Sequence, residues 1–200
     1  MSDFGTLLMN SRSGDRQSLS ALLDRYENYL QLLARTRIDG RLQSKIDTGD
    51  VIQETALFAL RDFPQFRGNT EPELAAWLRT VLSNVCATLE RKYFGTQSRD
   101  IRREISTQLE SSGSQLNQLV ATQRNTPSES AARRELAVLA ADAIASLPDE
   151  CREVIVRHHL SDQGISEIAD DMGKSRHAIR RLLAKSTILL QQALEDLNEF

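Results

Sequence analysis

The sequence predicts an all-α protein with two helical domains joined by a flexible polar linker, and three observations support this fold class. Leu and Ala dominate the apolar residues, and hydrophobic residues of all types make up 40% of the chain. Alternating runs of Val, Ile or aromatic residues, which are typical of sandwiches and barrels, are missing. Apolar residues instead recur at helical spacing on both sides of a polar stretch. We therefore expect domains at residues 1–95 and 131–200, with residues 96–130 as the linker.

The N-terminal domain is expected to be a run of helices. The earliest pattern places five apolar side chains at helical spacing: Leu19, Leu22, Leu23, Tyr26 and Leu30. A second pattern runs from Val51 to Phe63 and is ended by Pro64. A third runs from Glu73 to about Tyr93, with Pro72 in its first turn, where the missing N–H of proline costs nothing.

The linker and the C-terminal domain differ sharply in composition. The linker contains the polar stretches SSGSQLNQ and ATQRNTPSES, which are typical of mobile segments, with a frayed helix expected at Ile101–Leu109. Helical periodicity resumes at Ala131 and continues almost to the end of the chain. It is broken at Pro148, near Asp162–Gly164 and at Gly173.

Composition and motifs exclude several classes of protein. No apolar stretch approaches the ~18–20 residues that span a bilayer, and Met1–Asn10 does not resemble a signal peptide, so we expect a cytoplasmic protein without membrane insertion. Cys86 and Cys151 form no CxxC pair, which argues against a disulfide framework or a zinc site. The usual phosphate, metal and nucleophile motifs are absent, and the side chains of His158 and His159 should diverge by about 100° on a helix. We therefore expect no enzyme activity, no metal and no cofactor.

Basic residues gather in two stretches although the formal net charge is −3. Residues 173–185 carry five Lys or Arg and no acid, and residues 91–103 carry five against one acid. Local charge decides what a surface binds. One such stripe is equally well explained as a solvated helix face, but two separated stripes favour a partner of DNA or RNA.

The helix expected at 51–63 has an apolar face and an acidic, polar face. The apolar arc contains Ile52, Thr55, Ala56, Ala59, Leu60 and Phe63. The opposite face contains Asp50, Gln53, Glu54, Leu57 and Arg61. An exposed Leu within an acidic stripe predicts a docking surface for a basic partner helix. On composition alone, a solvated face with one stray Leu is an equal alternative.

The helix after Pro72 also has a polar face opposite its apolar one. Its expected core residues are Leu78, Val81, Leu82, Val85 and Leu89, and its opposite face presents Thr80, Ser83, Asn84, Ala87 and Arg91. Small polar side chains let a helix approach DNA closely, and Asn can pair with a base edge. A plain polar surface is the alternative. Trp77 borders the apolar arc, which favours a core position over base stacking.

Residues 165–186 predict a helix-turn-helix, with Gly173 in the turn and Ser175 as the N-cap of the second helix. The expected core is Ile165, Ile168, Ala169, Met172, Ile179, Leu182 and Leu183. The expected DNA contacts are Lys174, Ser175, Arg176, His177, Arg180, Arg181, Ala184 and Lys185. Arg suits guanine edges and phosphates, and Ala suits a thymine methyl group. A helical hairpin that binds no DNA is the alternative.

In this order, these elements resemble the extracytoplasmic-function (ECF) sigma factors of bacterial RNA polymerase. The planctomycete-type members are especially similar in two stretches, ALLDRYENYLQLLARTRIDGRLQSKID and RDFPQFRGNTEPELAAWLR. Residues 50–55 (DVIQET) look like the family helix that docks on the polymerase clamp. Phe66-Arg67-Gly68, Trp77-Leu78-Arg79 and Asn84 look like its promoter-melting and −10-reading segment. Leu147-Pro148, Arg152 and Val154 match the opening of its −35 domain, and Glu167-Ile168-Ala169, Met172-Gly173, Ser175 and Ala178-Ile179-Arg180 match its helix-turn-helix.

The resemblance implies an alternative-type sigma factor that binds core RNA polymerase and directs promoter-specific transcription initiation. It implies that Asp50, Gln53, Glu54 and Leu57 bind polymerase, and that helix 175–186 reads −35 DNA. The face of residues 80–91 would take the −10 element as single strand. The loop of Gly68, Asn69, Thr70 and Glu71 would capture a flipped base, which lowers the cost of strand opening. An anti-sigma factor is a further partner that the resemblance allows, and the chemistry belongs to the polymerase.

Two other functions explain part of the sequence. A stand-alone helix-turn-helix transcriptional regulator accounts for residues 165–186 but leaves the acidic stripe of residues 50–61 without a purpose. A helical anti-sigma or adaptor protein needs no DNA-binding face. Binding to polymerase separates the first alternative from a sigma factor, and salt-dependent binding to DNA separates the second.

Overall fold

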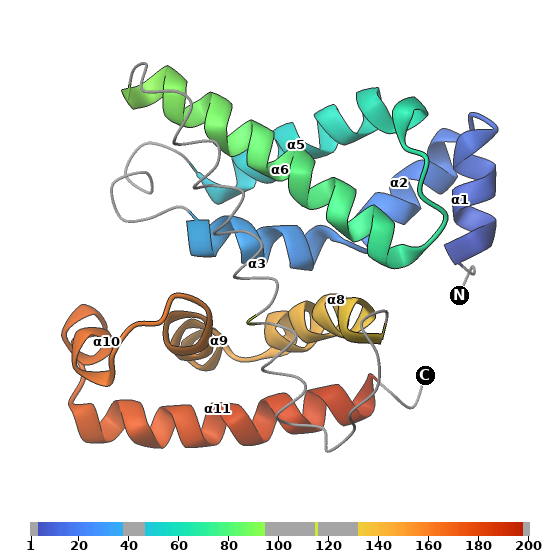
Figure 1. The fold of residues 1–200 in the computed structure, drawn as a ribbon. Helices are drawn as coiled ribbons and strands as arrows, with labels where there is room; N and C mark the ends of the chain where they lie inside the picture. The colour runs from blue at the N-terminus through green and yellow to red at the C-terminus, as the bar shows by residue number, and fades with distance from the viewer. Residues whose placement is uncertain (1–3, 38–46, 95–114, 116–131, 198–200) are drawn as a thin grey trace. The chain divides into compact units, whose positions relative to one another are not determined.

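The computed structural model describes residues 4–37, 47–94, 115 and 132–197 (Figure 1). Every element in this part of the chain is helical, which confirms the all-α class. The chain divides into two compact units, Met1–Glu110 and Ser111–Phe200. Except for Gln115, the expected linker lies outside the described residues, so its limits and its flexibility stay predictions.

The first unit is a bundle of helices. Its described elements are α1 (Phe4–Arg12), α2 (Arg16–Asp24), α3 (Glu27–Arg37), α5 (Thr48–Asp62), the short 3-10 helix η1 (Phe63–Gln65) and α6 (Glu71–Phe94). α1 packs against α2, whereas α3, α5 and α6 pack against one another. The largest fully buried side chains of this unit are Leu22, Tyr26, Tyr29, Leu33, Leu74, Leu78 and Leu82.

Side-chain caps fix where two of these helices begin. The Asp15 carboxylate accepts a hydrogen bond from the Gln17 N–H at the start of α2. The Asp47 carboxylate accepts one from the Gly49 N–H at the start of α5. Each cap satisfies an amide that has no partner within its helix. Helix α1 was not predicted, although its Phe4, Leu7 and Leu8 are buried.

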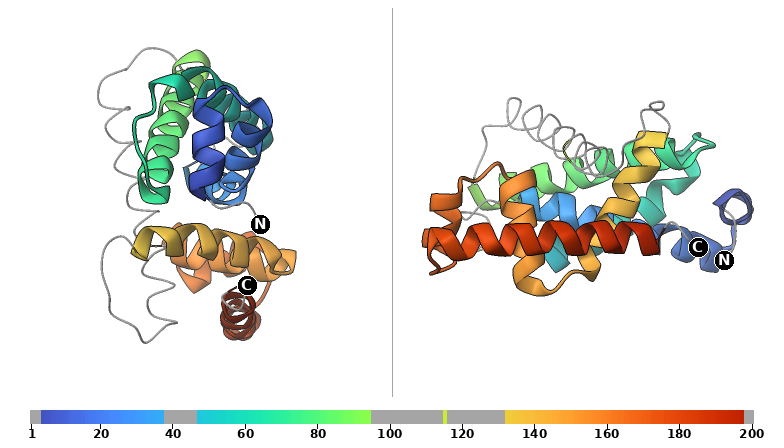
Figure 2. Two further views of the ribbon diagram at one scale, coloured as in Figure 1. Left: turned by 90° about the vertical axis from the view of Figure 1, so that its right-hand side faces the viewer. Right: turned by 90° about the horizontal axis from the view of Figure 1, so that it is seen from below.

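Within residues 132–197, the second unit has four α-helices and one π-helical turn. They are α8 (Ala132–Ser146), α9 (Asp149–Ile155), the π-helical η2 (Val156–Leu160), α10 (Ile165–Asp171) and α11 (Arg176–Asp196). The long helix α11 packs against α8, α9 and α10, and Figure 2 shows it from two further sides. A cluster at the helix-turn-helix contains Val154, Ile168, Ala169 and Ile179, with Ile165, Met172, Leu182 and Leu183 packed against it. This confirms all seven predicted core residues.

The histidine pair lies closer together than its predicted divergence suggests. The ring centroids of His158 and His159, which lie in the π-helical turn η2, are 4.9 Å apart. His158 Nδ1 lies 3.2 Å from the Gln163 carbonyl oxygen. Burial, and then the neighbouring His158, lower the pKa of His159. In the described part of the chain, none of the helices is long and apolar enough to cross a membrane.

Candidate functional site

The turn between α10 and α11 has the geometry that the sequence predicts, and α11 is the predicted recognition helix. Gly173 has a φ of +61°, a left-handed conformation that favours glycine. Ser175 Oγ accepts a hydrogen bond from the Ala178 N–H at 3.1 Å and caps α11. Because Ile179 is fully buried, the opposite side of the first turns of α11 must face solvent.

That solvent side carries the predicted DNA contacts. Six of the eight lie exposed on α11: Arg176, His177, Arg180, Arg181, Ala184 and Lys185. Within the described part of the chain, none of the four cations on this face forms an ion pair. The positive charge of α11 is therefore available to an anionic partner.

Lys174, just before the N-cap, has a protein partner. Its Nζ lies 2.9 Å from Glu150 Oε1 on α9, and the side chain is half-buried. The pair joins the turn to α9. Lys174 is therefore partly neutralised, unlike the cations that follow it on α11.

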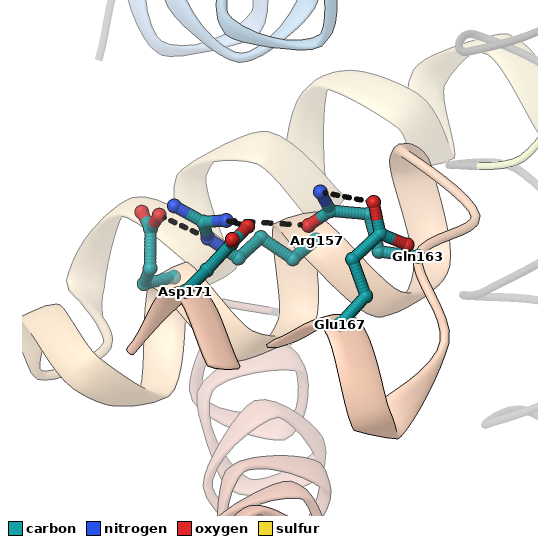
Figure 3. Close-up of polar contacts among 5 residues, drawn as sticks. Arg157, Gln163, Glu167 and Asp171 are labelled. Atoms are coloured by element: carbon teal, nitrogen blue, oxygen red, sulfur yellow. Dashed lines mark hydrogen bonds and ion pairs between the residues drawn. The ribbon is translucent and has the colours of Figure 1, made fainter. Parts of the chain in front are cut away.

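A network of polar side chains joins α10 to η2 and α9 (Figure 3). Arg157 donates from Nε to Glu153 Oε1 at 2.6 Å and from Nη1 to Asp171 Oδ2 at 2.7 Å. Arg157 Nη1 also lies 3.3 Å from Gln163 Oε1, and Gln163 Nε2 lies 3.4 Å from Glu167 Oε1. These contacts tie η2 and α9 to α10, so that Asp171 is paired within the unit.

Arg152, in the same unit, forms hydrogen bonds with the end of α8. Its Nη2 donates to the carbonyl oxygens of Ala145 at 2.8 Å and Leu147 at 2.9 Å. These carbonyls belong to the end of α8 and the residues that follow it, where a helix leaves acceptors without intrahelical partners. The sequence motif of Leu147-Pro148 and Arg152, which matches the opening of the family's −35 domain, therefore marks the capped end of α8.

On α5, the predicted acidic stripe is exposed. Asp50 and Gln53 are exposed, Glu54 is half-buried, and the Leu57 side chain is 66% exposed. Leu60 was expected in the apolar arc, but this is wrong, because it is 41% exposed. It follows Leu57 by three residues on the edge of that arc, so it extends the exposed apolar surface.

The polar face of α6 is narrower than predicted. Thr80, Asn84 and Arg91 are exposed, but Ser83 and Ala87 are only 6% and 3% exposed, so the prediction that these two share the open face is wrong. α6 packs against both α3 and α5, and a helix with two neighbours buries a wider arc than one apolar stripe.

The loop of residues 66–70 before α6 is closed by a capping box that sequence reasoning missed. Glu73 Oε2 accepts hydrogen bonds from the Asn69 N–H at 2.8 Å, the Thr70 N–H at 3.0 Å and Thr70 Oγ1 at 2.8 Å. In return, Thr70 Oγ1 accepts a hydrogen bond from the Glu73 N–H at 3.4 Å. These donors, first of all the Asn69 amide, lower the pKa of Glu73. The signal was a Thr followed three residues later by Glu.

The rings of Phe63, Phe66 and Trp77 pack against one another at this loop. The centroid of Trp77 lies 6.2 Å from that of Phe63 and 5.3 Å from that of Phe66, and the two Phe rings are buried. Trp77 is half-buried and packs against these two buried rings, so the prediction that favoured a core position is confirmed in part. A Cβ on Gly68 would lie 2.5 Å from Phe66 Cζ and 2.7 Å from Glu73 Cβ, so the chain at Gly68 touches both.

An arginine of α1, also missed from the sequence, holds the outer side of this loop. Arg12 Nη1 donates to Asn69 Oδ1 at 2.9 Å, and Nη2 donates to the Gly68 carbonyl at 2.5 Å. The guanidinium carbon lies 6.0 Å from the centroid of the Phe66 ring. No local sequence signal could reveal the contact, because Arg12 and Asn69 are 57 positions apart in the chain.

Two comparisons show what this chain is similar to in sequence. Residues 138–186, which contain the helix-turn-helix, match the family model of sigma-70, region 4. The chain is also 24% identical over 196 residues to the ECF RNA polymerase sigma-E factor of Haemophilus influenzae, and the alignment covers 96% of this chain and 95% of that protein. Together these findings support an ECF-type sigma factor that directs transcription initiation.

Proposed function

We propose that this chain is an alternative sigma factor of the ECF group, of the planctomycete type, which binds core RNA polymerase and directs it to a set of promoters. The observation that carries this proposal is the exposed basic face of α11, which follows a capped turn inside the segment similar to sigma-70 region 4. Catalysis belongs to the polymerase, and such a protein would act in the cytoplasm.

The −35 element is the proposed ligand of α11. Arg180 and Arg181 would place guanidinium groups in the major groove, where Arg pairs with the O6 and N7 atoms of guanine. Lys185 would contact phosphate one turn further along. Ala184 leaves room for a thymine methyl group between these cations. Lys174 would exchange Glu150 for a phosphate group when DNA binds.

The polymerase is the proposed partner of the α5 stripe. Asp50, Gln53 and Glu54 supply negative charge and hydrogen-bonding groups, and Leu57 supplies exposed apolar area beside them. Leu60 enlarges that apolar area. Such a surface suits a partner helix with basic and apolar residues. An anti-sigma factor would act as a competitor for this stripe or for the α11 face.

The −10 element, as a single strand, is the proposed ligand of the loop before α6. Gly68, Asn69, Thr70 and Glu71 would hold one flipped base. Further along α6, which begins at this loop (Figure 1), the exposed Thr80, Asn84 and Arg91 would contact the unpaired strand. Ser83 and Ala87 are not part of this surface because they are buried.

Binding to core RNA polymerase tests the proposal most directly. The double variant Gln53→Ala, Glu54→Lys should weaken binding to core enzyme, because it removes a hydrogen-bonding group and reverses a charge within the stripe. Asp24→Lys makes the same charge change at an exposed position on α2 and should bind core enzyme like the unmodified protein. Thermal unfolding should be similar for all three proteins.

Three outcomes would contradict the proposal. Unchanged affinity of the double variant would exclude the stripe as the docking surface. Failure of the unmodified chain to bind core enzyme while it binds DNA would favour a stand-alone regulator. Absence of salt-dependent DNA binding by the holoenzyme would favour an adaptor. Transcription with core enzyme on a genomic library would identify the promoters.

A further inference from the structure

The loop at Gly68–Thr70 is hydrogen-bonded by a carboxylate on one side and by a guanidinium group on the other. On the inner side, the Glu73 carboxylate accepts the backbone N–H groups of Asn69 and Thr70 and the Thr70 hydroxyl. On the outer side, the Arg12 guanidinium donates to the Gly68 carbonyl and to Asn69 Oδ1. Most of the polar groups that this loop could offer to a ligand are therefore already bonded within the protein.

The chemistry of the guanidinium fixes the orientation of the Asn69 amide. Arginine has five N–H donors and no acceptor, so it can only bond the oxygen side of a carboxamide. With Oδ1 turned towards Arg12, the Nδ2 amino group must point in the other direction. Asn69 is exposed, so this amino group is the donor that the loop presents to solvent.

We propose that Arg12 is a positioning and specificity-determining residue of the base-capture loop. By bonding Oδ1 of Asn69 and the carbonyl of Gly68, it presents the Asn69 amino group as a donor to an acceptor atom of the captured base. This inference rests on the proposed function of the loop as the −10 site. It also sets a preference, because an Asn that reads adenine in the bidentate way needs its oxygen as well as its nitrogen.

Open-complex formation by the holoenzyme tests the inference, measured by permanganate reactivity on a duplex promoter. Arg12→Ala should reduce opening by about tenfold, the size expected for loss of one well-placed base contact. The reduction should be much smaller on a template whose −10 region is already mismatched, since opening no longer depends on capture. Arg16→Ala removes an exposed positive charge four residues away and should open the duplex normally.

Two variants of Asn69 distinguish a role as hydrogen-bond donor to the base from a purely structural role in the loop. Asn69→Asp keeps an oxygen for Arg12 but has no N–H donor, so it should lose opening to the same extent as Asn69→Ala while binding polymerase normally. If Arg12 acts through Asn69, adding Arg12→Ala to Asn69→Ala should cause little further loss. Arg12→Ala alone should also flatten the base preference at one −10 position.

The outcomes distinguish this inference from the proposed function. If Asn69→Ala loses opening but Arg12→Ala does not, the role of Arg12 is refuted while the −10 function stands. If the losses of the two single variants multiply in the double variant, Arg12 acts independently of Asn69 and the inference is also refuted. If Asn69→Asp opens the promoter normally, the donor role is refuted. If Asn69→Ala has no effect, both the inference and the assignment of the loop are wrong.

Discussion

Replacing Gly68 with Ala tests the closed architecture of the loop at Gly68–Thr70, the proposed −10 site. The added Cβ would lie 2.5 Å from Phe66 Cζ and 2.7 Å from both Phe66 Cε2 and Glu73 Cβ. Neither neighbour can move easily. The Phe66 ring is buried against Phe63 and Trp77, and Glu73 Cβ is attached to the backbone of α6.

The expected magnitude follows from two opposing effects. Forcing a methyl group into a packed site usually costs ~1–3 kcal/mol. Replacing Gly with Ala also restricts the unfolded chain, which offsets roughly 0.4–1 kcal/mol of that cost. Because the contacts would be shorter than 3 Å, the packing cost should lie in the upper part of its range, ~2–3 kcal/mol, and the free energy of unfolding should fall by about 1–2.5 kcal/mol. In a domain of this size the melting temperature should fall by roughly 5–15 °C.

The chain carries its own probe for this measurement. Trp77 is the single Trp of the sequence and packs against Phe66, so its fluorescence reports unfolding of the first unit. Gly49→Ala is the matched control, because its Cβ would lie no closer than 3.5 Å to Asp47 and Gly49 is helical. That control should raise the melting temperature slightly, since Ala is favoured over Gly in helices. A melting temperature for Gly68→Ala at or above that of the unmodified protein would refute the reasoning.

The remaining predictions concern the second unit. Arg181→Ala should cost about 1–3 kcal/mol at one position of the −35 element, whereas Lys185→Ala should weaken binding to all sequences and reduce the salt dependence; equal loss for Arg181→Ala on every −35 variant, in binding assays, would exclude base reading. Burial in the folded state lowers the pKa of His159 from its ordinary value of 6.5. The free energy of unfolding should therefore be highest above about pH 6.5, and it should fall as the pH drops from there towards the lowered pKa of the folded state. Far-UV circular dichroism should show a smaller loss on acidification for His159→Gln, and an unchanged pH dependence would contradict this.

Sequence reasoning succeeded where the determining residues are close together in the chain. The helix-turn-helix core, its N-cap Ser175 and its turn at Gly173 all lie within residues 165–186, and each has a local signal. The acidic stripe of α5 was predicted for the same reason, because one amphipathic helix contains all of it.

It failed where burial or contact depends on distant segments. Ser83 and Ala87 look exposed from the periodicity of α6 alone, and only the packing of α6 on two neighbours shows that its buried arc is wide. The contact of Arg12 with Asn69 joins residues far apart in sequence, on a helix that periodicity did not reveal. Such contacts follow from tertiary packing and leave no short-range pattern.

The position of Arg12 at the end of α1 bears on which fragment of this protein is worth isolating. The earliest helical pattern in the sequence begins at Leu19, so periodicity alone gives no reason to keep α1 in a fragment of the N-terminal domain. A fragment cut after α1 would keep α2 to α6, yet the Gly68 carbonyl and the Asn69 amide would lose the guanidinium that bonds them. The smallest fragment that preserves this loop therefore begins with α1. A fusion partner joined ahead of α1 would be attached to a helix that contacts the loop.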